Sequence, residues 1–406
     1  MSGTGTFLPE GRGQRALVAA CGAHLLQDGL VALQYVLLPV LAQAFGLNYT
    51  QVGLIRALTT GAMTLLEIPA GILAERFGEL RLLVFGLVCA AAGYLGVALA
   101  TDFYLILAGF LVAGCGAAFQ HSLASALIAR SFDDANRRRS LGVYNAFGDA
   151  GKLAFTGLFS LAIGVGFAWN IIITLLCLAT LGFSVLLLAW SRRDARGDSN
   201  EAADEDETSS GSKWGIKQPR RFGWLCFTVF LDSLTQTVFL TFIAFLLLEK
   251  GSSEALASLA VVLALCGGMV GKFACGFLAV RYGDRGAFRI LQTLTIAGLV
   301  ILLPLPVLPT LVLLPLVGVA VQGSSTVTYG AISDFVHRDR QSRGYALIYG
   351  LSGISTVFGP ALFGLLADIY GIDVSLLILA IVTGLTLFSG RVLQQTVPLA
   401  TGSSNP

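Results

Sequence analysis

Charged residues are scarce in this chain, and the motifs of soluble enzymes are missing. Asp, Glu, Lys and Arg make up 12% of the 406 residues, whereas 55% are hydrophobic and the mean hydropathy is +0.78. Such a chain has too little polar surface for a soluble globule. It contains no phosphate-cradling Gly-Lys-Ser/Thr loop and no extramembrane segment large enough for a catalytic domain. We therefore expect neither an enzyme nor an ATP-driven pump, and no cofactor.

Paired cysteine motifs are also absent. The seven cysteines are scattered through apolar segments, at Cys21, Cys89, Cys115, Cys177, Cys226, Cys266 and Cys275. We interpret them as small buried side chains and expect no metal site. The first 15 residues are polar and glycine-rich, and no small-residue cleavage site follows a short apolar core. A removable signal peptide is therefore not expected.

Long apolar runs fill most of the chain instead. A helix needs roughly 20 apolar residues to cross the hydrocarbon of a bilayer. Twelve such runs are predicted, at approximately 16–44, 51–75, 81–101, 103–129, 140–162, 167–190, 222–248, 254–280, 287–307, 310–333, 343–367 and 372–393. The sequence therefore predicts an all-α integral membrane protein with twelve transmembrane helices.

The positions of the cations predict its orientation. Apart from Arg56, Lys152, Lys250 and Lys272, every Lys and Arg lies at a terminus or in an even-numbered connection. Cytoplasmic loops carry an excess of these residues. We therefore expect both termini in the cytoplasm of a bacterial cell and a multi-pass protein of its cytoplasmic (inner) membrane.

A short charged turn occurs twice, 205 positions apart. The first copy contains Gly71, Glu75, Arg76, Gly78 and Arg81, and the second contains Gly276, Arg281 and Gly283. The first glycine of each copy is expected to allow a close helix contact, and the second to form a tight reversal. The charged residues are either a gating latch that pairs with a neighbouring helix end or only a solvated, topology-setting loop. Glu67, one turn before Gly71, is a further gating candidate.

This repeat predicts two pseudo-symmetric six-helix halves, at 1–190 and 222–406 with a short tail, joined by a cytoplasmic linker at 191–221. The acidic run Asp204–Glu207 is interpreted as part of a solvated tether. At an offset of 202, Gly148 and Gly151 match Gly350 and Gly353, and Gln120 matches Gln322. Asp28 matches Asp232 at an offset of 204, so intramembrane polar residues recur in both halves.

The repeated charged turn, which we call the signature turn, and the twelve predicted helices resemble the major facilitator superfamily of transporters. The resemblance covers the full length of the chain. The stretches His24–Asp28, Phe45–Ile55 and Gly114–His121 further resemble the fosmidomycin-resistance group of exporters. The resemblance implies the major facilitator fold and alternating access to a central site. In that fold, helix five packs against helix eight, so Asp149 would be shared between Lys152 and Lys272.

Ionisable residues inside the membrane are candidates for function, because they are costly unless they are paired or hydrated. His24 and Asp28 share a helix face and form the leading proton-coupling site, with Asp149 as a third member; the alternative is a hydrogen bond that only fixes packing. Asp149 and Lys152 are three residues apart, so they form either a structural ion pair or part of the site. The substrate-binding candidates are Arg56, Gln120, His121, Lys152, Asp232, Lys272 and Gln322.

These residues predict a secondary active transporter that exports a small organic compound by proton coupling. Arg56, Lys152 and Lys272 favour an anionic substrate. Two alternatives stay open: a proton-coupled symporter or uniporter that imports an organic anion, and a lipid-moving or sensing protein of the same fold. The expected partners are a small-molecule substrate, protons and the lipid bilayer, with no nucleic acid, and one bundle acting as a monomer.

Overall fold

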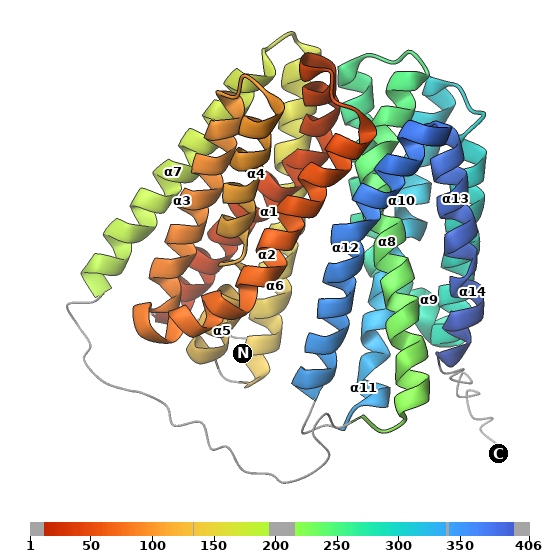
Figure 1. Ribbon diagram of the computed structural model, residues 1–406. Coiled ribbons are helices and arrows are strands. Elements are labelled where there is room, and N and C mark those ends of the chain that lie inside the picture. Colours follow the sequence, from red (N-terminus) through yellow and green to blue (C-terminus); the bar gives the residue numbers. More distant parts are fainter. Residues whose placement is uncertain (1–11, 133, 195–215, 338–340, 394–406) are drawn as a thin grey trace, which may run out of the picture. The chain divides into compact units, whose positions relative to one another are not determined.

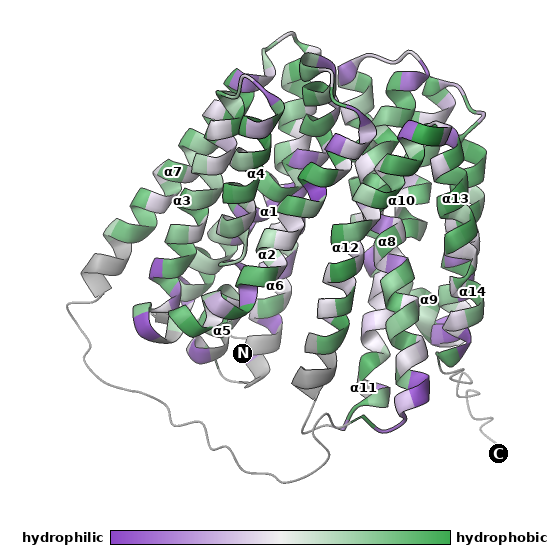
Figure 2. Ribbon diagram, in the orientation of Figure 1, coloured by the Kyte–Doolittle hydropathy of each residue, from purple (hydrophilic) through white to green (hydrophobic). Residues whose placement is uncertain are grey.

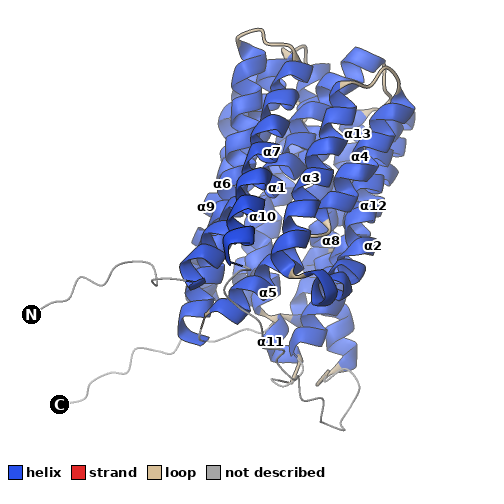
Figure 3. Cartoon of the chain, turned by 90° about the vertical axis from the view of Figure 1, so that its left-hand side faces the viewer, coloured by secondary structure: helices blue, strands red, loops and turns tan. Residues whose placement is uncertain are grey.

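The computed structural model describes residues 12–132, 134–194, 216–337 and 341–393, and these residues form helices and no strand (Figures 1 and 3). The predicted acidic run Asp204–Glu207 lies outside the described residues. In chain order the elements are α1 (Arg12–Phe45), α2 (Tyr49–Phe77), α3 (Glu79–Ala98), α4 (Phe103–Ala117), α5 (His121–Ser131), α6 (Asp134–Gly164), α7 (Trp169–Asp194), α8 (Pro219–Glu249), α9 (Glu254–Leu302), α10 (Val307–Gly330), α11 (Ile332–Phe335), α12 (Gln341–Tyr370), α13 (Ile372–Gly384), α14 (Thr386–Ser389) and the 3-10 turn η2 (Gly390–Val392).

Most of these helices are long and apolar, as Figure 2 shows. Ten helical segments of the described chain are long and apolar enough to cross a membrane. One of them, α9, contains two predicted spans, because its 49 residues are interrupted at Gly283 by φ 70° and ψ 162°. The predicted fifth span lies on α6, which carries Asp149 and Lys152 and is not among the ten. The prediction of an all-α multi-pass membrane fold is confirmed.

The described chain divides into two compact units. Of the described residues, the first unit contains those in 12–46 and 58–194, and the second contains those in 47–57 and 216–393. The start of α2 therefore groups with the second unit. The predicted domain boundaries at 190 and 222 stay a prediction.

Glycines set the distance between α1 and α6 in the first unit. A Cβ added to Gly148 would lie 2.4 Å from Cε1 of His24, and one added to Gly151 would lie 2.0 Å from the backbone oxygen of Leu25. Because small residues let helix backbones approach closely, α6 can pack directly on α1. This contact brings the polar face of α6 to the polar face of α1.

The second unit uses the same device between α9 and α10. Added Cβ atoms at Gly267 and Gly318 would lie 1.9 Å and 2.2 Å from the backbone oxygens of Pro315 and Ala264. In this unit the start of α2 is capped by Asp368 of α12, whose carboxylate accepts hydrogen bonds of 2.8 Å from the backbone N–H groups of Tyr49 and Thr50. A carboxylate at a helix N-terminus satisfies donors that have no partner within the helix.

The signature turns agree with the sequence expectation in one respect only. Gly78 and Gly283 have φ of 82° and 70°, the left-handed region that glycine adopts without strain. The expected close helix contact at Gly71 and Gly276 is wrong, because an added Cβ at either position would meet no described atom within 4 Å. These two glycines therefore leave open space beside their helices.

The α1–α6 contact gives a test with an internal control. Gly151→Ala should lower the stability of the purified protein by about 1–3 kcal/mol, because the new methyl group would press against backbone that cannot move aside. Gly157→Ala, on the same helix, should be tolerated, since its Cβ would meet no described atom within 4 Å. Thermal unfolding in detergent compares the two variants. Equal melting temperatures would contradict the inferred packing.

Candidate functional site

His24 and Asp28 lie on one face of α1, as their spacing predicts. His24 Nε2 is 3.2 Å from Asp28 Oδ2, and both side chains are buried. The His24 ring stacks on the Tyr144 ring of α6 with a centroid distance of 3.9 Å. The helix spacing and the stacking together fix the imidazole beside the carboxylate.

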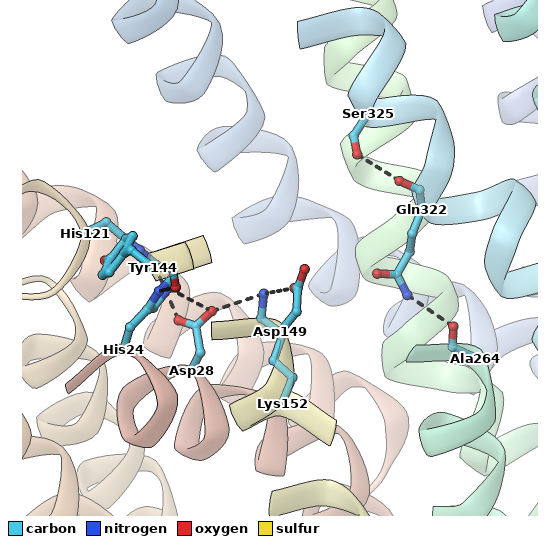
Figure 4. A network of polar contacts seen from close by, with 9 residues as sticks. All are labelled: His24, Asp28, His121, Tyr144, Asp149, Lys152, Ala264, Gln322 and Ser325. Atoms are coloured by element: carbon cyan, nitrogen blue, oxygen red, sulfur yellow. Dashed lines mark hydrogen bonds and ion pairs between the residues drawn. The ribbon is translucent and has the colours of Figure 1, made fainter. Parts of the chain in front are cut away.

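Helix α6 adds a second carboxylate and a cation to this pair (Figure 4). Lys152 Nζ lies 3.1 Å from Asp28 Oδ2 and also 3.1 Å from Asp149 Oδ1. The predicted contact between Asp149 and Lys152 is therefore present. The ammonium is shared between the carboxylate of its own helix and that of α1, so the two helices form one charged cluster.

His121 reaches the same cluster from α5. The chain leaves helix α4 after Ala117 and begins α5 at His121, whose Nε2 lies 3.8 Å from Asp28 Oδ1. Its side chain is 48% exposed, against 7% for Asp28. Gln120, at the break, donates a 3.5 Å hydrogen bond to the Tyr144 hydroxyl. His121 is therefore the most exposed member of the group.

The hydrogen bonds of His24 constrain where its protons lie. Nδ1 is 2.8 Å from the Tyr144 carbonyl oxygen, and because a carbonyl only accepts, Nδ1 carries a hydrogen. In a neutral ring, Nε2 would then be a bare acceptor facing the Asp28 carboxylate. The contact is favourable when a proton lies between the two groups. Lys152 bonds to the same carboxylate oxygen at 3.1 Å, so Asp28 is held between an imidazole and an ammonium.

The three residues His24, Asp28 and His121 could each offer one metal ligand within 4.8 Å of the others. The Lys152 ammonium, however, already supplies positive charge at 3.1 Å from Asp28. A divalent cation would have to take a place beside that ammonium, and like charges repel. The arrangement therefore suits an ion-pair and proton site better than a metal centre.

The second unit holds a different polar group around Asp232. This buried carboxylate accepts hydrogen bonds from Gln236 (3.0 Å), Gln292 (2.6 Å) and Ser324 (2.7 Å). Sequence reasoning missed all three donors, although Gln236 is four residues from Asp232 and shares its helix face. Gln322 donates to the Ala264 carbonyl at 3.4 Å and contributes to the packing of α9 on α10. The substrate-binding role expected for Asp232 stays a prediction.

The remaining candidates are dispersed. Arg56 is buried at the start of α2, in the second unit, and Lys272 is half-buried on α9. Glu67 is half-buried on α2, whereas the turn residues Arg76, Arg81 and Arg281 are exposed. The Glu75 side chain lies outside the described residues. Near the first turn, the described ion pair joins two other residues, Glu79 and Arg130, at 2.8 Å.

Glu79 and Arg130 also line a cavity of about 360 Å³, together with Ile68, Gly71 and Ser122. This cavity lies at the signature turn and does not include the members of the His24–Asp28 cluster. The sequence did not predict this ion pair, because the two residues lie 51 positions apart on different helices, and helical spacing relates only residues of one helix.

Comparison with known proteins identifies the family. The model of the Major Facilitator Superfamily matches residues 20–228 and 225–402, and the chain belongs to this superfamily. No curated protein sequence matches the chain significantly. The finer resemblance to fosmidomycin-resistance exporters stays a prediction.

Solved structures of three transporters share the fold at low identity. A bacterial homolog of the human lysosomal transporter Spinster superposes with a TM-score of 0.77 at 14% identity, covering 95% of this chain and 98% of its own. The nucleoside transporter NupG gives 0.73 at 12%, covering 93% and 99%. The E. coli fucose:proton symporter FucP gives 0.59 at 16%, covering 94% and 98%. At these identities the likeness concerns the fold alone.

The charged cluster predicts an order of stabilities. Lys152→Gln should be the most damaging single change, because it leaves two carboxylates without their shared cation. The loss should be smaller than the roughly 3–5 kcal/mol of a fully buried pair, since the Lys152 side chain is 32% exposed. Replacing Asp28 and Asp149 by Asn in the Lys152→Gln background should recover most of the stability. Thermal unfolding compares the stabilities of Lys152→Gln, Asp28→Asn, Asp149→Asn and the triple variant. A triple variant less stable than Lys152→Gln would refute the argument.

Proposed function

We propose that this multi-pass membrane protein is a proton-coupled secondary transporter that exports a small organic anion by alternating access. The observation that carries the proposal is the cluster in which the buried His24 and Asp28 meet the partly buried Asp149 and Lys152. Such ionisable residues within membrane helices mark ion and substrate pathways. A fucose:proton symporter shares this fold.

The proton assignment follows from counting charges in the cluster. With His24 protonated, two cations face two carboxylates. Loss of that proton leaves one uncompensated negative charge in a buried site, which is unfavourable. We therefore infer that the His24–Asp28 pair loads and releases the proton. The exposed His121 ring, 5.3 Å from the His24 ring, provides the route to solvent.

The substrate class follows from Lys152. Its ammonium is held by two carboxylates at equal distance, so an entering anion can replace either of them without leaving the lysine unpaired. Arg56 on α2 and Lys272 on α9 are further candidates for binding the anion, and both positions belong to the second unit. A carboxylate or phosphonate group has the matching charge.

The proposed direction of transport has its own supporting argument. The resemblance of the His24–Asp28 and Phe45–Ile55 stretches to exporters supports proton antiport, in which the anion and the proton compete. The electrostatics of the cluster favour the second candidate, import by symport, because an anion that displaces Asp28 leaves the carboxylate a stronger proton acceptor. The distribution of Lys and Arg supports an orientation with both termini in the cytoplasm, and we propose a bacterial inner-membrane location. A single bundle suffices for the cycle.

Proton exchange on anion binding tests the proposal. Purified protein in weakly buffered detergent is titrated with a panel of small carboxylates and phosphonates while a pH dye records protons. We expect a ligand-linked proton signal that His24→Gln and Asp28→Asn each abolish. Proton release would support export by antiport, and proton uptake would support import by symport.

His337→Gln is the matched control, because His337 is exposed and lies outside the cluster. It should leave the proton signal unchanged. If His24→Gln and Asp28→Asn bind the same anion with the same proton exchange as the unmodified protein, the cluster is not the coupling site. If no anion of the panel gives either a proton signal or a thermal shift, the anionic substrate class is wrong.

A further inference from the structure

Asp232 occupies the position in the second unit that Asp28 occupies in the first, but the surroundings of the two carboxylates differ. Asp28 contacts His24, His121 and Lys152. At the offsets that align the two halves, these three residues correspond to Thr228, Gly323 and Ile354. Every basic neighbour of the first carboxylate is therefore replaced by a neutral residue around the second.

The contacts agree with this substitution pattern. Within the described part of the chain, the hydrogen-bond partners of Asp232 are two amides and one hydroxyl, from Gln236, Gln292 and Ser324. No described cation forms an ion pair with it. The titratable side chain near enough to interact with its charge is Tyr329 of α10, and a phenol is neutral at pH 7. Asp232 is 2% exposed, so water does not compensate its charge.

An ionised carboxylate in such a place is costly. Burying an unpaired charge in an apolar medium is so unfavourable that the group instead becomes neutral. Three neutral hydrogen bonds offset part of this cost but supply no opposite charge. A carboxylate without a counter-cation is therefore expected to hold a proton.

Gln292 supplies the acceptor that such a proton needs. Its Oε1 atom is buried and has no hydrogen-bond partner among the described residues. The 2.6 Å contact between its amide and Asp232 Oδ1 is shorter than the usual N–H···O distance and falls in the range of O–H···O bonds. Turning the amide about its terminal bond places Oε1 against Oδ1.

We propose that Asp232 is a second protonation site, in which a neutral carboxylic acid donates its proton to Oε1 of Gln292. The site is independent of the His24–Asp28 cluster and does not rest on the proposed substrate. Each unit then carries its own exchangeable proton. In the first unit the proton belongs to the His24–Asp28 pair within an ion-pair cluster, and in the second it neutralises an isolated acid.

Infrared spectroscopy of the purified protein tests this directly, without a substrate. A protonated carboxyl group gives a C=O stretching band that an ionised carboxylate does not. We expect such a band in the spectrum of the unmodified protein at neutral pH, and we expect it to shift in heavy water. The band should be missing from the spectrum of Asp232→Asn. Asp28→Asn and Asp149→Asn are the matched controls, and both should retain the band, because those two carboxylates are paired with Lys152.

Two further measurements keep the test decisive. Gln292→Leu should shift the band to higher frequency, since the acid loses a strong hydrogen bond, and this holds even if Asp232→Asn folds poorly. Asp232→Asn should keep the melting temperature of the unmodified protein, because its amide mimics the neutral acid. The proposal is overturned if no band depends on Asp232, if the band is lost in Asp28→Asn, or if it disappears when Na⁺ replaces K⁺, which would make Asp232 an alkali-cation site.

Discussion

A carboxylate placed among membrane helices must be neutralised, and much of the polar structure of this protein follows from that requirement. In the first unit, Asp28 is neutralised by basic side chains brought from α1 and α6. In the second unit, the hydrogen-bond donors to Asp232 among the described residues are neutral. The two carboxylates are thus surrounded by different chemistry. The difference is chemical, because the basic positions of one half carry neutral residues in the other.

The charged cluster exists only because two helices come close enough to share a cation. Gly148 and Gly151 have no side chain to keep α6 away from α1, and Lys152 directly follows Gly151 on the same helix. A larger residue at either position would move the ammonium relative to Asp28. Helix packing and electrostatics therefore cannot be varied separately at this site. The ion pairs also explain why polar residues are tolerated on α6 at all.

The sequence predicted the local features of the fold and the site well. Hydropathy located the spans, and helical spacing placed His24 beside Asp28 and Asp149 beside Lys152, since both depend only on the period of one helix. The contact from Lys152 to Asp28 crosses between helices and depends on how α1 and α6 are rotated, which spacing does not encode. The same holds for Gln292 and Ser324 at Asp232 and for Glu79 at Arg130. Gly71 and Gly276 were misread, because a glycine in a repeated motif does not by itself indicate which neighbour, if any, it contacts.

The polarity of α6 has a consequence for how the protein is made. Each Asp or Lys at the centre of an inserting helix adds roughly 2.5–3.5 kcal/mol to the cost of entering the bilayer. Helix α6 carries Asp149 and Lys152 within its predicted span and does not meet the apolarity of the other spans. Helix α6 is therefore poorly suited to pass from the translocation machinery into the bilayer without a partner helix. Helix α1, synthesised more than 100 residues earlier, holds the carboxylate that makes α6 acceptable to lipid. Biogenesis of the first unit is thus expected to require that α1 remain at the translocation machinery until α6 has been synthesised. The two helices would then enter the membrane together.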